Sequence, residues 1–272
     1  MKILLFGSTG LLGSAFTEVL SGEEVYSYSK KECDITDAIG VSAIVRERHP
    51  DIVINTTGWT NVEGAEEEPE KAFAVNAYAV GRLATICESE KIPLVHFSTD
   101  YVFDGSREGG YVESDSPAPI NLYGASKAAG ETLLQKETGC FFLIRTSWLF
   151  GPHGKNFVST ILKKAKEQPN ISVVNDQFGK PTYSRDLAIA TLALMKSQKY
   201  GIYHIVNEGV VSWFDFAIEI VRTAEIDSKV LPMKSADLHQ KARRPRISAL
   251  MNTKLAKLRS WKEALHDNLL TL

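Results

Sequence analysis

A buried strand that runs directly into a glycine loop and a helix constrains this chain more than any other feature. Residues 2–6 form a short strand whose last four residues are apolar, and Gly7, Gly10 and Gly13 follow before a helical pattern over residues 14–20. Gly7 permits a tight turn, Gly10 lets a diphosphate approach the backbone, and Gly13 lets the helix pack on the strand. The unpaired N–H groups that begin the helix attract an anion. This order predicts a doubly wound α/β fold that binds a dinucleotide.

The second expected strand covers residues 24–28, and the residues after it indicate whether the cofactor is NAD or NADP. An acidic residue usually stands there when the adenosine ribose carries a free 2′-hydroxyl. This chain has Ser29, Lys30 and Lys31 instead, and their hydroxyl and ammonium groups suit a 2′-phosphate. We therefore expect NADP, with NADH as the alternative. The competing interpretation is that both lysines are solvated loop charges.

Polar loops follow the next two strands at the edge where open α/β sheets bind ligands. Strand 51–54 leads into a small-residue turn at 55–60, and strand 93–97 leads into Ser98, Thr99 and Asp100. Between them, residues 71–90 predict one long helix. Hydroxyls and a carboxylate at a strand end can bind a carbonyl substrate, although Ser-Thr-Asp alone is more often a turn or a cap.

Tyr123 and Lys127 lie four residues apart among small and helix-favouring residues. One helical turn places the phenol and the ammonium on the same face. We expect the lysine cation to lower the phenol pKa from about 10, so that a proton exchanges with an alcohol near neutral pH. An isolated pair of this spacing is usually a solvated tyrosine beside a lysine. The loops that precede it favour the catalytic interpretation.

Composition narrows the class of protein. The chain has 272 residues, 44% hydrophobic and 24% charged, with a net charge of −2, so neither nucleic acid nor a membrane surface is an expected partner. The three cysteines lack metal-ligand spacing and predict reduced thiols in the cytoplasm. The six histidines are dispersed, and only His153 lies beside the predicted crevice. We expect no metal site.

The second half of the chain predicts a smaller lobe over the strand ends. We expect residues 1–148 and about 176–206 to form a Rossmann-type NADP-binding domain. Residues 149–175 and 207–272, approximately, would form the substrate-binding lobe. The densest positive cluster lies at 241–246, where Arg243 or Arg244 would neutralise a substrate diphosphate, since arginine matches phosphate oxygens. A solvated loop is the alternative.

Through its glycine loop and its Tyr-x-x-x-Lys motif, the chain resembles the extended short-chain dehydrogenase/reductase superfamily. Within it, the chain is similar to the dTDP-4-dehydrorhamnose reductase family over residues 2 to about 250. That narrower resemblance rests on STDYVFDG at 98–105, NLYGASK at 121–127, RTSWLFG at 145–151 and DQFGKPT at 176–182. WFDFA at 213–217 and RPRIS at 244–248 add to it.

The resemblance assigns roles residue by residue. It implies a catalytic triad of Thr99, Tyr123 and Lys127. The implied cofactor contacts, beyond this tyrosine and lysine, are Gly10, Leu11, Leu12, Asp34, Ile35, Gly58, Trp59 and Thr60. The implied sugar contacts are Asp100 and Trp148, and Tyr101 lies in the same loop.

The implied reaction is reduction of the C4 ketone of dTDP-4-dehydro-L-rhamnose to dTDP-L-rhamnose by NADPH, in nucleotide-sugar and cell-surface polysaccharide biosynthesis. Asp100 and Tyr101 follow Thr99 where sugar dehydratases have Asp-Glu, which favours simple reduction. Ser14 and Ala15 replace a glutamate that binds magnesium between subunits in some members, so we expect no metal-bridged dimer and leave monomer and homodimer open. The alternatives are a reductase of another 4-keto nucleotide sugar and a non-catalytic NADP-binding regulatory subunit.

Overall fold

The computed structural model describes residues 1–272 and is built around one six-stranded sheet. Its spatial order is β2 (Glu24–Tyr28), β1 (Lys2–Phe6), β3 (Ile52–Asn55), β4 (Leu94–Thr99), β5 (Phe141–Thr146) and β10 (Gly201–His204). All neighbouring strands are parallel, which confirms the predicted fold class. The strand order reverses between β1 and β3, the point at which such sheets bind ligands.

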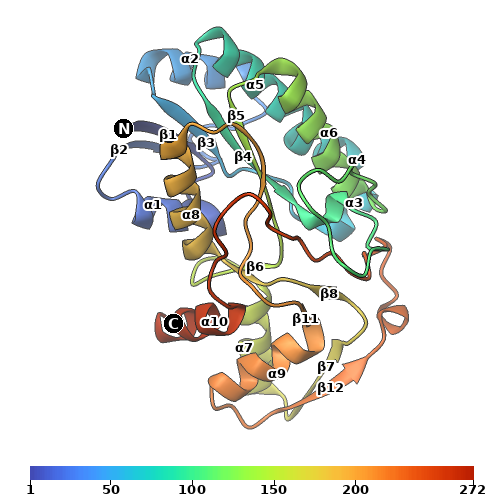
Figure 1. The fold of residues 1–272 in the computed structure, drawn as a ribbon. Coiled ribbons are helices and arrows are strands. Elements are labelled where there is room, and N and C mark those ends of the chain that lie inside the picture. Colours follow the sequence, from blue (N-terminus) through green and yellow to red (C-terminus); the bar gives the residue numbers. More distant parts are fainter.

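Helices cover both faces of this sheet (Figure 1). α1 (Leu11–Val19) and α8 (Ser184–Ser197) pack on one face, and α2 (Ala38–Arg48), α5 (Ala79–Ser89) and α6 (Leu122–Glu137) pack on the other. Alternate side chains of β1 enter the two cores, because successive residues of a strand point to opposite faces. Burial on both faces explains the unbroken apolar run at the start of the sequence.

The segment predicted as one helix over residues 71–90 is interrupted. α3 (Val62–Glu67) and α4 (Pro69–Phe73) precede a π-helical turn over Ala74–Tyr78, and α5 begins only after it. A π turn inserts an extra residue into a helix and often marks a functional site. Here the turn directs Asn76, which is fully buried, toward the third strand's loop.

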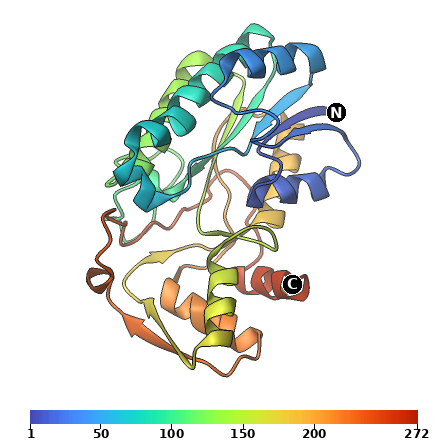
Figure 2. The ribbon, with the colours of Figure 1, turned by 180° about the vertical axis from the view of Figure 1, so that it is seen from behind.

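The smaller lobe lies below the carboxyl ends of the strands, as both ribbon views show (Figures 1 and 2). Its helices are α7 (Phe157–Glu167), α9 (Trp213–Thr223) and α10 (Trp261–Leu270), which share an apolar core. Three two-stranded ladders complete it: β6 (Leu149–Phe150) with β9 (Thr182–Tyr183), β7 (Asn170–Val174) with β12 (Lys229–Met233), and β8 (Phe178–Gly179) with β11 (Val211–Ser212). Two 3-10 turns lie at Asp100–Val102 and Ser235–Leu238.

The chain passes between the two parts several times. Within residues 176–206, β8 and β9 pair with strands of the lobe, whereas α8 and β10 pack on the main sheet. Near the C-terminus, Leu255 and Leu258 return to pack against the core beneath α8. No helix is both long and apolar enough to cross a membrane.

Candidate active site

The glycine loop has the geometry that its sequence predicts. Gly7 has φ +84°, a left-handed conformation that side chains disfavour. A Cβ on Gly13 would lie 2.1 Å from the Gly7 carbonyl oxygen, so only glycine permits this close packing of loop and helix. Gly10 is the N-cap of α1 and supplies no side-chain cap. The first N–H groups of the helix therefore remain available to an anion.

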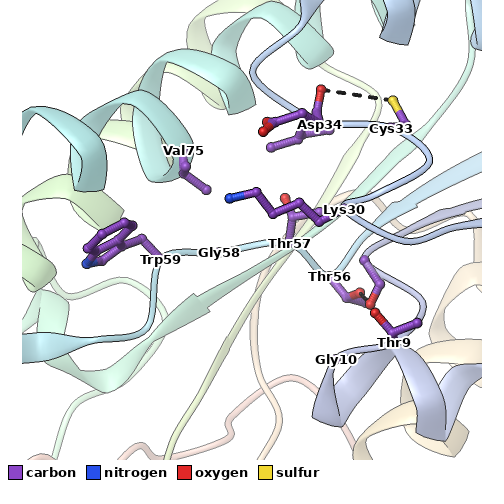
Figure 3. A pocket seen from close by; sticks show the side chains of 12 residues that line it. Thr9, Gly10, Lys30, Cys33, Asp34, Thr56, Thr57, Gly58, Trp59 and Val75 are labelled. Carbon is purple, nitrogen blue, oxygen red and sulfur yellow. Dashed lines mark hydrogen bonds between the residues drawn. The ribbon is translucent and has the colours of Figure 1, made fainter.

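A pocket of about 240 Å³ lies between this loop and the ends of β2 and β3 (Figure 3). Seven residues predicted to bind the cofactor line it: Gly7, Gly10, Lys30, Asp34, Ile35, Gly58 and Trp59. The Lys30 side chain extends across the pocket toward Val75. Ser29 does not line the pocket, and both its backbone N–H and its hydroxyl donate to Glu32 at 2.7 Å.

A second cavity, of about 560 Å³, continues from the first past the loop at residues 56–59, and we call it the crevice. Besides Gly10, Gly58 and Trp59, which line both cavities, eight predicted site residues from separate parts of the chain line the crevice: Leu11, Leu12, Thr60, Thr99, Asp100, Tyr123, Lys127 and Trp148. The structure thus brings together the phenol, the ammonium and the hydroxyl on which the sequence prediction depends.

Helix α6 positions the phenol and the ammonium. Asn121 caps the helix, its Oδ1 accepting from the Gly124 N–H at 2.7 Å, so the register of the first turn is fixed. Tyr123 follows in that turn, and its ring meets the Tyr101 ring edge-on at 5.8 Å. Thr99 ends β4 opposite and donates its hydroxyl to Asp100 Oδ1 at 3.0 Å.

The expected lowering of the Tyr123 pKa is wrong for this structure. Burial raises that pKa to about 12, and the Thr99 hydroxyl only partly opposes the rise. Lys127 is not among the groups that shift this pKa, and its Nζ donates to the Phe97 carbonyl oxygen at 2.5 Å. Burial also lowers the Lys127 pKa to about 8. Tyr123 is therefore a protonated phenol at neutral pH, which suits a proton donor.

Asp100 is a second unusual acid in the crevice. It is 2% exposed, and its Oδ2 has no hydrogen-bond partner. Burial raises its pKa to about 7, and contacts with the Ser248 and Thr99 hydroxyls limit the rise. A buried carboxyl with a free oxygen can bind a sugar hydroxyl or amide without first losing another partner.

Trp148 is packed against the lobe and also lines the crevice. It lines the crevice, yet its ring stacks on Trp213 with centroids 3.4 Å apart. Gly179 lies so close that a Cβ there would come within 2.5 Å of the indole. The backbone of Trp148 is left-handed, with φ +48°. Trp213 and Gly179 of the lobe thus hold the indole in place. Only the part of the indole that they do not cover lines the crevice.

The positive cluster lies at the edge of the site. The Arg244 Nη1 donates to Glu63 at 2.8 Å, and its guanidinium also contacts Tyr101. The Arg243 side chain is exposed, and its carbonyl oxygen accepts from Asn121. Neither arginine lines either cavity. His153 is also peripheral, since its ring pairs with Glu18 at 2.6 Å.

Asn76 is a site residue to which the sequence assigned no role. Its Oδ1 accepts from the Trp59 N–H at 2.8 Å, and its Nδ2 donates to the Trp59 carbonyl at 3.0 Å and to the Ser126 hydroxyl at 2.9 Å. One amide thus holds the loop at residues 58–60 against α6. The only sequence signal was an asparagine inside a helical pattern.

Known proteins resemble this chain along its whole length. The family described as the RmlD substrate binding domain matches residues 1–272. The spore coat polysaccharide biosynthesis protein SpsK of Bacillus subtilis (strain 168) is 38% identical, over 98% of this chain and 96% of its own. A dTDP-4-dehydrorhamnose reductase of Aggregatibacter actinomycetemcomitans is 38% identical, over 93% and 92%. A dTDP-4-keto-6-deoxy-D-glucose reductase of Streptomyces niveus is 35% identical, over 96% and 90%.

A solved structure agrees with these relatives. The dTDP-4-dehydrorhamnose reductase of Bacillus anthracis str. Ames, crystallised in complex with NADP, superposes with a TM-score of 0.97 and covers 100% of both chains at 38% identity. Sequence similarity, fold and the residues that line the crevice all agree with the resemblance inferred from the motifs. The chain is a member of the dTDP-4-dehydrorhamnose reductase family.

Proposed function

We propose that this protein uses NADPH to reduce the C4 ketone of dTDP-4-dehydro-L-rhamnose to dTDP-L-rhamnose. The observation that carries the proposal is a single crevice, lined by Thr99, Tyr123 and Lys127, that opens onto a glycine loop. Family membership and the NADP complex of the Bacillus anthracis relative support the choice of reaction and of cofactor.

The residues of the first pocket fit NADP. The uncapped start of α1 offers N–H groups and a positive dipole end to the diphosphate. Lys30 extends into the pocket and provides an ammonium for the 2′-phosphate, a role the Ser29 hydroxyl cannot share while Glu32 holds it. When bound, NADPH supplies the hydride that the substrate carbon accepts.

The protein's own residues supply the proton and the orientation. Tyr123 is protonated at neutral pH and donates to the developing alkoxide. Thr99 lies at the strand end beside it and hydrogen-bonds the same oxygen. Asp100 and Trp148 contact the sugar from the crevice wall. Donors fixed before the reaction stabilise charge that develops only in the transition state, and the rate gain comes from there.

Oxidation of NADPH with a panel of 4-keto nucleotide sugars tests the proposal. We expect the highest kcat/KM with dTDP-4-dehydro-L-rhamnose. Tyr123→Phe should lower kcat about a hundredfold or more, because the proton donor is removed. Tyr111→Phe, a buried tyrosine outside the crevice, is the matched control. NADPH binding without reduction of any sugar in the panel would instead indicate a regulatory subunit.

The Streptomyces niveus relative supports a second candidate, a reductase of a different dTDP-4-keto sugar. The hydride and proton chemistry would be the same, and only the contacts from the lobe would differ. A kcat/KM at least tenfold higher for dTDP-4-keto-6-deoxy-D-glucose than for the rhamnose precursor would favour this candidate.

A further inference from the structure

Three buried polar side chains from three elements form a line that ends at Lys127. Asn55 ends β3, His96 lies within β4, and Lys127 belongs to α6; they are 0%, 0% and 4% exposed. Asn55 Nδ2 lies 3.2 Å from His96 Nδ1, and His96 Nε2 lies 3.4 Å from Lys127 Nζ. The proposed reaction requires the lysine but gives no role to the other two residues.

Thr57 fixes the polarity of this line. Its backbone N–H donates to Asn55 Oδ1 at 3.0 Å, and its hydroxyl donates to the same oxygen at 2.6 Å. A backbone N–H can only donate, so Oδ1 of Asn55 faces Thr57 and Nδ2 faces the imidazole. The Nδ2 group is also purely a donor, so His96 Nδ1 must accept and carries no proton.

The proton of His96 therefore sits on Nε2 and points at Lys127. An ammonium has no lone pair, so it cannot accept this N–H, whereas a neutral amine can. The amine still donates to the Phe97 carbonyl oxygen at 2.5 Å. Protonating both nitrogens of His96 is excluded, because Nδ1 would then oppose the donor group of Asn55.

The other ionisable groups nearby do not change this conclusion. Glu131, one turn farther along α6, acts to raise the Lys127 pKa, but Arg145 of β5 binds its carboxylate at 2.7 Å. Tyr123 on α6 is a neutral phenol at neutral pH. Asp100, which follows Thr99 in the crevice lining, contacts the hydroxyls of Ser248 and Thr99. Burial, the dominant effect on both groups, lowers the pKa of His96 and that of Lys127.

We infer that His96 is a positioning residue that, with Asn55, favours the neutral amine form of Lys127 in the cofactor-free protein. Binding of NADPH is then linked to uptake of a proton from solvent by the fraction of Nζ that is neutral. This arrangement lowers the population of an unpaired buried cation while the site is empty. The inference rests on the proposed function only in taking NADPH as the ligand.

Nitrogen NMR of the cofactor-free protein tests the tautomer directly. In protein labelled with ¹⁵N-histidine, His96 should show an unprotonated Nδ1 and a protonated Nε2 throughout pH 6–9. The His96 resonances are identified by their loss in the His96→Asn variant. In Asn55→Asp the new carboxylate should accept from Nδ1–H and reverse the tautomer. An Nδ1–H tautomer or an imidazolium in the wild type would overturn the inference.

Proton linkage tests the consequence. Calorimetric titration with NADPH in two buffers of different ionisation enthalpy should give an uptake of about half a proton at pH 8, since the Lys127 pKa is about 8. Above that pH the wild-type Kd should rise up to about tenfold per pH unit. His96→Asn and Asn55→Asp should each reduce this uptake at pH 8 and move the pH dependence to higher pH, because the lysine then no longer faces an N–H donor and stays charged to a higher pH.

Two controls isolate the effect. His204→Asn removes another fully buried histidine, one that contacts Arg145, and should leave the uptake at its wild-type value. Repeating all titrations in an Asp100→Asn background removes the carboxyl that titrates nearby. Uptake that persists unchanged in Asn55→Asp refutes the linkage. Failure of the wild type to bind NADPH would instead refute the proposed function.

Discussion

Two buried cations lie beside helix α6, and their surroundings differ completely. Arg145, on β5, is 1% exposed and binds the Glu131 carboxylate through Nε at 3.0 Å and Nη2 at 2.7 Å. Its guanidinium also lies over the Phe103 ring, 5.1 Å from the centroid. Lys127, one helical turn before Glu131, is 4% exposed, faces the crevice, and forms no ion pair.

The difference separates a structural charge from a functional one. A buried arginine and a carboxylate that form an ion pair compensate each other's charge within a core. Removing one partner leaves the other as an uncompensated buried charge. A buried lysine that has no carboxylate partner lowers the stability of the fold. Lys127 is such a residue, since it contacts His96 and faces the crevice. Such groups persist where chemistry needs them.

The largest effect should come from breaking the paired charge. Arg145→Met should lower the free energy of unfolding by about 3–5 kcal/mol, measured by urea denaturation, because Glu131 is left buried and unpaired. The double variant Arg145→Met/Glu131→Leu should recover most of the loss. A single variant within about 1 kcal/mol of the wild type would remove the contrast between the two cations.

Removing the unpaired charge should have the opposite sign. Lys127→Met should abolish most turnover yet raise the free energy of unfolding at pH 7 by up to about 3 kcal/mol. The folded pKa of about 8 lies below the ordinary 10.5, so between these values the unfolded chain binds more protons and wild-type stability rises with pH. The advantage of the variant should therefore shrink across that window. A destabilised variant at pH 7 would contradict this.

The loop that Asn76 holds should respond less strongly. Asn76→Ala leaves the Trp59 N–H without its partner, which should weaken NADPH binding about tenfold. Ser126→Ala removes only the hydroxyl that accepts from Asn76 Nδ2 and should change the Kd much less. Fluorescence titration with NADPH measures both. Equal effects would mean that the helix, and not the loop, determines affinity.

The positive cluster should have the smallest effect. Arg244→Ala should raise the KM for the nucleotide sugar about fivefold, and the exposed Arg243→Ala less, because neither arginine lines the crevice and exposed charges contribute little. Glu63→Gln, which removes the carboxylate that Arg244 binds, is the matched control. If neither arginine variant changes KM, their assignment to the diphosphate is wrong.

The sequence predicted the parts of the site that depend on local pattern. The strand, Gly7, Gly10 and Gly13 lie within one βαβ unit, and Tyr123 and Lys127 lie within one helical turn, so spacing alone places them. The superposed fold and the crevice lining agree with those predictions.

The rest depends on contacts between distant residues. His96 and Lys127 are 31 residues apart, and Asn76 and Ser126 are 50 apart, so no local pattern joins them. The π turn that aims Asn76 lies inside a stretch with ordinary helical periodicity. The prediction for the Tyr123 pKa is wrong for the same reason, because the burial that raises this pKa comes from residues far apart in the sequence.

The repeated passage of the chain between the sheet and the lobe limits how this protein can be divided. Strand β10 completes the main sheet beside β5, although it comes after most of the lobe's first half. A fragment cut after residue 148 would uncover β5 as a long apolar border, open to self-association. Residues 1–148 therefore do not form an independent domain. A fragment or chimaera that contains them must also include residues 184–204, which form α8 and β10.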